Sequence, residues 1–84
     1  MECRRSEIAI IAEILRVALD KPGITKVMYS VNLNHRAACR YLDQLQKKGL
    51  IETTDHSLRK QFQTTPIGKE VLDRLEETVQ LLRH

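Results

Sequence analysis

Two arginines, spaced four residues apart, are the side chains best suited to recognising another molecule. Arg36 and Arg40 would project from the same face of a helix, one turn apart. A guanidinium group donates two parallel hydrogen bonds to a phosphate, or to the O6 and N7 atoms of guanine. Asn34 and His35, which precede the arginines, add donors for phosphate oxygens or base edges. This cluster indicates a surface for phosphates and base edges, although a solvated helix face with ordinary charges looks similar.

Other chemistry finds little support. His35 and Cys39 are four residues apart, a spacing that can place two metal ligands on one side of a helix. Further ligands would have to come from Cys3 and His56 by folding, so we expect no metal and no cofactor. The three glycines form no phosphate-cradling loop, and no H-E-x-x-H motif or nucleophile elbow is present. We therefore do not expect an enzyme.

The elements that must position the arginines begin with two helices. Ser6 or a neighbour can cap the first, which carries apolar residues at helical spacing. Its expected inner face consists of Ile8, Ile11, Ala12, Leu15, Ala18 and Leu19. A short second helix is expected to run through Val31, with Thr25 as its N-cap. Ile24 and Tyr29 would then pack together across that cap.

A third helix is predicted over residues 35–48, capped by Asn34 and ended by Gly49 in a left-handed conformation. Its expected inner stripe consists of Ala38, Tyr41, Leu42 and Leu45. A rotation of 100° per residue places four charged residues on the opposite face. They are Arg36, Arg40, Asp43 and Lys47. The cationic majority of this face strengthens the prediction of an anionic partner, and Asp43 counts against it.

A β-hairpin is predicted next, with strands over 50–54 and 59–64. Phe62 and Thr64 would share the inward side of the second strand. The polar side chains expected to meet a phosphate backbone or a minor groove from this hairpin are His56, Arg59, Lys60 and Gln61. A basic edge that discourages strand-to-strand aggregation is the alternative interpretation.

Thr65 and Pro66 suit the N-cap and the first position of a last helix over 66–84. The apolar residues Leu72, Leu75, Val79 and Leu82 are spaced three, four and three apart, as in the seam of a coiled coil. We expect this seam to join two copies into a homodimer. The alternative is that the helix folds back on the first helix of its own chain.

Three helices, a hairpin and a fourth helix form the layout of a winged helix-turn-helix, a mostly α fold. This layout predicts a double-stranded DNA-binding protein, either a transcriptional regulator or a chromatin-type binder. The helix at 35–48 would enter the major groove, with the hairpin as wing over 52–63. The alternative is a winged-helix module that docks on another protein and does not bind DNA.

Three segments resemble the small archaeal winged-helix DNA-binding proteins of the ten-kilodalton chromatin type. They read EIAIIAEIL, TKVMYSVNLNHRAACRYLDQLQKKGLIE and TTPIGKEVLDRL, and the resemblance extends over residues 4–75. It implies DNA binding as a symmetric dimer whose long C-terminal helices pair antiparallel, with 35–48 as recognition helix and 52–63 as wing. The sequence departs from this family at His84, where it ends sooner than the long coiled coil.

Composition agrees with one small domain that has an anionic partner. The 84 residues are 42% hydrophobic and 30% charged, with a net charge of +3. Residues 1–63 carry 11 Lys and Arg against 7 Asp and Glu, whereas residues 64–84 carry 3 against 4. Cys3, Arg4 and Arg5 lead into an amphipathic segment and not into a signal peptide. We expect a cytoplasmic, nucleoid-associated protein.

Overall fold

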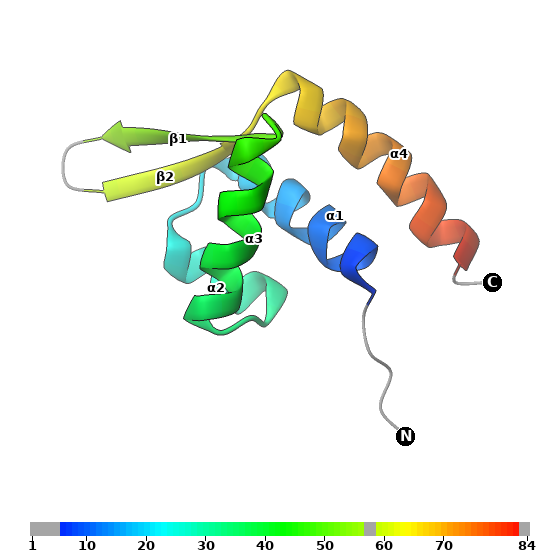
Figure 1. The fold of residues 1–84 in the computed structure, drawn as a ribbon, viewed down its shortest axis with the longest axis horizontal. Helices are drawn as coiled ribbons and strands as arrows, with labels where there is room; N and C mark the ends of the chain where they lie inside the picture. The colour runs from blue at the N-terminus through cyan, green and yellow to red at the C-terminus, as the bar shows by residue number, and fades with distance from the viewer. Residues whose placement is uncertain (1–5, 57–58, 83–84) are drawn as a thin grey trace.

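The structure is a computed structural model. It describes residues 6–56 and 59–82, and all side chains among them except those of residues 55, 56, 59, 79 and 82. In chain order the elements are α1 (Glu7–Val17), η1 (Ala18–Asp20), α2 (Ile24–Val31), α3 (His35–Lys47), β1 (Ile51–His56), β2 (Arg59–Thr64) and α4 (Pro66–Leu82). Figure 1 shows α1 between α3 and α4, with the hairpin projecting to one side. The expected order of three helices, a hairpin and a fourth helix is confirmed.

Three of the expected helix-terminal features are present. The Ser6 Oγ accepts a hydrogen bond from the backbone N–H of Ala9 at 3.1 Å, which starts α1. The Asn34 Oδ1 accepts one from the N–H of Ala37 at 2.8 Å, which starts α3. Gly49, with φ of 76°, follows α3 in the left-handed region. The two cap bonds span only three residues, so local sequence is enough to place them.

The start of α2 differs from the prediction. The helix begins at Ile24 with Gly23 as its N-cap, and no side chain accepts a cap hydrogen bond. Thr25 therefore lies in the first turn, and Tyr29 is 82% exposed and does not pack across the cap. The cause is a distant contact: the carbonyl of Pro22 accepts a hydrogen bond from the N–H of Phe62 at 2.9 Å. Pairing with β2 fixes the extended backbone just before the helix.

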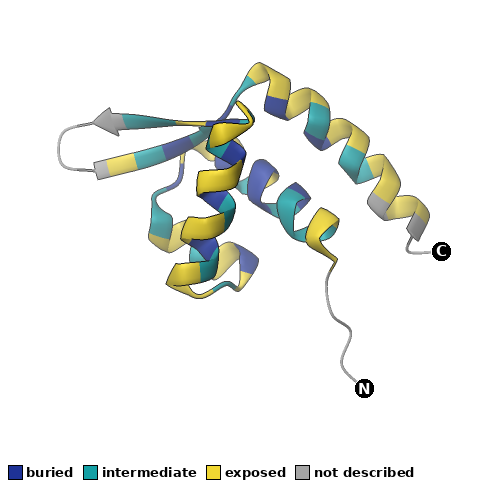
Figure 2. Cartoon of the chain, in the orientation of Figure 1, coloured by how far each residue is buried: buried dark blue, intermediate teal, exposed yellow. Residues whose placement is uncertain are grey.

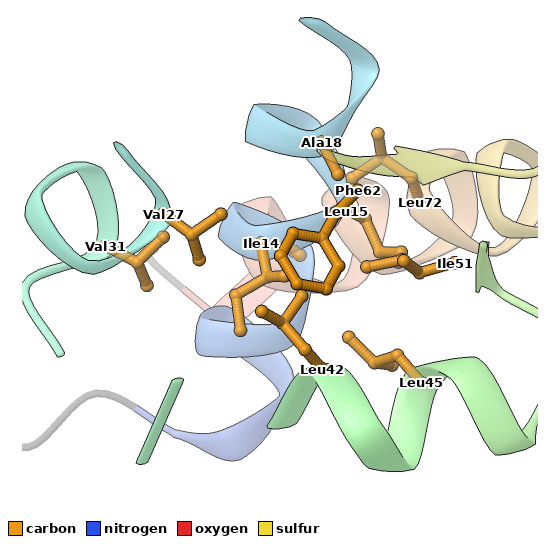
Figure 3. Close-up of a cluster of buried hydrophobic side chains, with 11 residues drawn as sticks. Ile14, Leu15, Ala18, Val27, Val31, Leu42, Leu45, Ile51, Phe62 and Leu72 are labelled. Carbon is orange, nitrogen blue, oxygen red and sulfur yellow. The ribbon is translucent and has the colours of Figure 1, made fainter. Parts of the chain in front are cut away.

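The core is aliphatic apart from Phe62, and α1 contributes most to it. Figure 3 shows its side chains converging from all the helices and both strands. Ile14 and Leu15 are fully buried, whereas Ile8 and Leu19, expected on the inner face, are 40% and 43% exposed. Helical spacing did not identify Ile14 because α1 is apolar around most of its circumference. It packs against α4 on one side and α2 on the other, so no single stripe defines its buried face.

The hairpin is antiparallel, with Ile51 opposite Thr64 and Thr53 opposite Phe62. Phe62 and Thr64 both point inward, as predicted, with exposed fractions of 6% and 7%. The Thr64 hydroxyl donates a hydrogen bond to the backbone carbonyl of Leu15 at 2.6 Å. This bond satisfies a buried polar group and ties the base of the wing to α1.

The start of α4 is joined tightly to the end of α3. The Thr65 Oγ1 accepts a hydrogen bond from the N–H of Gly68 at 3.0 Å, as expected of an N-cap, and donates one to the carbonyl of Gly49 at 2.7 Å. The N–H of Thr65 also donates to the carbonyl of Leu50 at 3.0 Å. Thr65 therefore ties the start of α4 to the turn that follows α3.

The prediction for Leu72 needs correction. Leu72, expected at an interface between copies, is 3% exposed and belongs to the core, and Leu75 packs partly buried against that core. Ile67, near the start of α4, is 61% exposed. The first half of the apolar seam thus faces α1 of the same chain, and an ion pair between Arg16 and Glu76 accompanies this contact. Val79 and Leu82 lie where the structure describes only the backbone.

None of the helices within residues 6–56 and 59–82 is long and apolar enough to span a membrane.

A side chain at Gly68 should destabilise the fold. A Cβ atom there would overlap the carbonyl oxygen of Leu50 and lie 2.8 Å from Cγ2 of Thr64. Because that carbonyl already accepts a hydrogen bond from Thr65, its backbone has little freedom to move. We expect Gly68→Ala to lower the free energy of unfolding by about 1–3 kcal/mol in chemical denaturation.

The matched control is Gly23→Ser. A Cβ at Gly23 would meet its nearest neighbour, the carbonyl oxygen of Lys60, at an ordinary 3.9 Å. Serine is also a preferred N-cap, so this variant should keep or raise the stability. A Gly68→Ala protein as stable as the wild type would show that α4 can move away from Leu50.

Candidate nucleic-acid interface

The outer face of α3 presents four charged side chains, as the sequence predicts. They are Arg36, Arg40, Asp43 and Lys47, and all four are exposed. Figure 2 shows exposed positions along α3. The opposite face is buried in the core through Ala38, Leu42 and Leu45. Packing of that inner face fixes the rotation of the helix about its axis. We call the four outer residues the α3 ridge.

Charge on the α3 ridge is unevenly compensated. The Lys47 Nζ lies 3.3 Å from Oδ2 of Asp43, one turn earlier on the helix. Both side chains are well exposed, so this ion pair contributes little to stability, but it places a neutralising cation beside Asp43. Arg36 and Arg40 make no ion pair or side-chain hydrogen bond with another described residue. The two arginines thus carry the net positive charge of the ridge.

Asn34 and His35, at the start of α3, already make contacts within the helix. The Asn34 side-chain oxygen caps the helix, which leaves its amide NH₂ as the group able to donate outward. His35 is exposed, and its ring nitrogens lie 3.6 and 3.7 Å from Sγ of Cys39. Cys39, one turn after His35, is exposed.

The described residues contain no group of three or more side chains placed to hold a metal ion. Cys3, named as a possible third ligand, lies outside the described residues, and so does the side chain of His56.

A groove of about 270 Å³ separates the α3 ridge from the wing. Cys39, Asp43 and Gln46 line it from α3, and Lys60 and Phe62 line it from β2. The Lys60 Nζ lies 6.0 Å from the centroid of the Phe62 ring. Lys60 lies opposite Asp55, near the turn of the hairpin, and its side chain reaches back toward α3.

The other predicted wing residues are described unequally. Gln61 pairs with Thr54 and is partly exposed, on the strand face opposite Phe62. His56 and Arg59 form the last described pair of the hairpin, and their side chains lie outside the described part of the structure.

A second groove, of about 310 Å³, borders the α3 ridge on the side of α1. Glu7, Arg40, Tyr41 and Gln44 line it. Gln44 and Gln46 were not among the predicted contact residues, although helical geometry alone places them at the two flanks of the ridge. Glu7 was not predicted either, and no local signal exists for it, because only folding brings α1 beside Arg40.

Comparison with known proteins identifies relatives over almost the whole chain. The family model described as winged helix-turn-helix matches residues 4–83. The uncharacterized protein MJ0287 of Methanocaldococcus jannaschii is 30% identical over 80 residues, which cover 94% of this chain and 78% of that protein. A second protein of that organism, MJ0290, is 32% identical over 80 residues, but the match covers only 36% of its length.

Solved structures agree with this assignment. Sso10a-2, a DNA-binding protein from Sulfolobus solfataricus, superimposes with a TM-score of 0.85 and 32% identity, covering 94% of this chain and 83% of that one. The transcriptional regulator BldR from Sulfolobus solfataricus has a TM-score of 0.81 at 21% identity, covering 87% and 55%, and shares the fold alone. The resemblance to small archaeal winged-helix proteins is thereby confirmed, and the chain belongs to the winged helix-turn-helix family.

Proposed function

We propose that this protein binds double-stranded DNA, with α3 in the major groove and the wing against the backbone or the minor groove. The observation that carries the proposal is the pair Arg36 and Arg40, exposed and without a described partner on a helix whose other face is fixed in the core. The similarity to Sso10a-2, described as a DNA-binding protein, supports it.

The dimensions of α3 suit this role. Its 13 residues span roughly 20 Å, and the major groove of B-DNA, about 12 Å wide, admits one helix. Arg36 and Arg40 lie in its first two turns, the part of a recognition helix that contacts base edges. Lys47, paired with Asp43, is better placed for a phosphate. Asn34, His35 and the wing residues His56, Arg59, Lys60 and Gln61 complete the proposed contact set.

The biological role that we propose follows from DNA binding by a domain of this size. A DNA-binding winged helix of this size suits a transcriptional regulator or a chromatin-type binder associated with the nucleoid. The function is binding, without catalysis, and Arg36 and Arg40 provide its chemistry with no cofactor. Both a preferred site and general binding are compatible with these contacts.

We also propose that two copies associate through the end of α4. Leu81 is 76% exposed there, beside the seam positions Val79 and Leu82. Leu72 is buried by contacts within the chain and Leu75 is partly buried by them, so the interface that we propose lies further along α4. A two-fold dimer would present two α3 helices to successive major grooves, about 34 Å apart on one face of the duplex.

Binding to duplex DNA should depend strongly on salt. If a dimer makes about six phosphate contacts, the logarithm of the association constant should fall against the logarithm of salt concentration with a slope near −5.

Arg40→Ala should weaken binding by about 1–3 kcal/mol, roughly 5- to 150-fold, because it removes an unpaired cation. Asp43→Asn should tighten binding, because it removes a negative charge and releases Lys47 from its ion pair. Fluorescence anisotropy across a salt series measures all three.

Two results would contradict DNA binding. One is the absence of affinity for random duplex DNA even at about 50 mM salt, which would favour a protein-docking module. The other is affinity indifferent to salt, since phosphate contacts release counterions. Arg40 is exposed, so unfolding of Arg40→Ala would show that its role is structural.

The dimer should depend on Leu81, which is exposed near the end of α4. Leu81→Asp places a charge at an exposed position, so the domain should stay folded while the interface is broken. We expect sedimentation velocity to give a dimer for the wild type and a monomer for Leu81→Asp. The monomer should bind DNA more weakly, because two linked contacts become one. A wild-type chain that stays monomeric at high micromolar concentration would rule this interface out.

A further inference from the structure

A basic groove lies where the loop before α2 meets the wing. It has a volume of about 750 Å³, and three lysines from separate parts of the chain line it. These are Lys21 in the loop, Lys26 in the first turn of α2 and Lys60 on β2, and all three are exposed. Asp20 also borders the groove, so the four formal charges leave a positive surplus. We call this the lysine groove.

Backbone contacts hold the loop that carries Lys21 beside the strand that carries Lys60. The Phe62 N–H donates to the carbonyl of Pro22 at 2.9 Å, which fixes this point of the loop beside β2. Gly23 lies next to the backbone of Lys60, since a Cβ built on it would be 3.9 Å from the Lys60 carbonyl oxygen. The relative positions of Lys21 and Lys60 are thus set by the fold and not by flexible side chains alone.

The backbone of the groove also suits an anion. Gly23 is the N-cap of α2 and has no side-chain oxygen to accept from the first amides of the helix. Those amides and the positive end of the helix dipole lie beside Lys26. Lys21 occupies the left-handed region, with φ of 53° and ψ of 54°, where asparagine or glycine is less strained.

The lysine groove is continuous with the proposed DNA face. Lys60 lines it, and the same residue lines the groove beside Cys39 and Asp43 of α3. A helix seated in the major groove has a phosphate backbone on each side, because the groove is only about 12 Å wide. The DNA strand that passes between α3 and the wing would therefore bring its phosphates to Lys60 and then to Lys21 and Lys26.

We propose that the lysine groove binds a backbone phosphate of the DNA duplex held by α3. This inference rests on the proposed DNA binding. It extends the contact surface to Lys21 and Lys26, which lie outside α3 and the wing. A free phosphate ion or a nucleotide would present the same phosphate chemistry to these lysines as the DNA backbone, and is the alternative ligand. Because Lys60 lines both the lysine groove and the groove beside α3, we assign the bound phosphate to the DNA backbone.

The test is the double variant Lys21→Asn with Lys26→Gln. Asparagine tolerates the left-handed conformation better than lysine, so the fold should be kept or stabilised while two charges are removed. We expect weaker binding to all duplex sequences alike, and a salt slope less negative by about 1 for each phosphate that the protein no longer neutralises. Lys21→Gly with Lys26→Gln, which also relieves the strain at residue 21, should behave in the same way.

The matched control is Lys69→Gln with Arg74→Gln on α4. It removes the same charge from two exposed residues that line neither groove beside Lys60. Its salt slope should stay at the wild-type value. If the groove variant merely matches this control while the wild type binds DNA, the inference is wrong and the proposed function stands. If the wild type does not bind DNA at all, the proposed function itself fails.

A titration without DNA separates the two sources of phosphate. Inorganic phosphate and a nucleoside triphosphate are added to the ¹⁵N-labelled protein, and the amide signals of residues 21–26 are followed. We expect only weak, non-saturating shifts. Saturable binding of either probe, with an unchanged DNA salt slope in the double variant, would overturn the assignment to the DNA backbone.

Discussion

The close approach of α4 to the turn after α3 sets the arrangement of the other elements. Gly68 lies against the Leu50 carbonyl with no room for a Cβ, and the Thr65 hydroxyl bonds both Gly68 and Gly49. One residue earlier, the hydroxyl of Thr64 bonds α1 through Leu15. These contacts fix the angle at which the hairpin leaves the domain. The position of the wing beside α3, and hence of Lys60 between two grooves, follows from them.

The sequence predicts structure well where the cause is local. The caps at Ser6, Asn34 and Thr65 are side-chain bonds across three residues, and the structure contains all of them. The start of α2 could not be predicted in this way, because a hydrogen bond from Phe62 to Pro22 determines it. Helical spacing on α1 likewise left Ile14 unassigned, since a helix covered on two sides buries more than one stripe.

The same distinction applies to the candidate interface. The α3 ridge could be predicted from spacing alone, because its inner residues Ala38, Leu42 and Leu45 leave only one face free. Compensation of Asp43 by Lys47 is equally local, one turn along the helix. Glu7 beside Arg40, and Lys21 beside Lys60, depend on tertiary contacts between segments over 30 residues apart. Local sequence patterns cannot reveal such pairs, so an analysis of short sequence segments underestimates the extent of the basic surface.

The apolar seam of α4 shows why a helical pattern cannot name its own partner. Spacing of three and four residues indicates that two helices face each other, and Leu72 and Leu75 face α1 of the same chain. Leu81, at 76% exposure, lies off that contact. In Figure 1, α1 separates α4 from α3, so a second copy seated on the outer side of α4 would leave the α3 ridge uncovered. Association through α4 and DNA binding through α3 are therefore compatible within one fold.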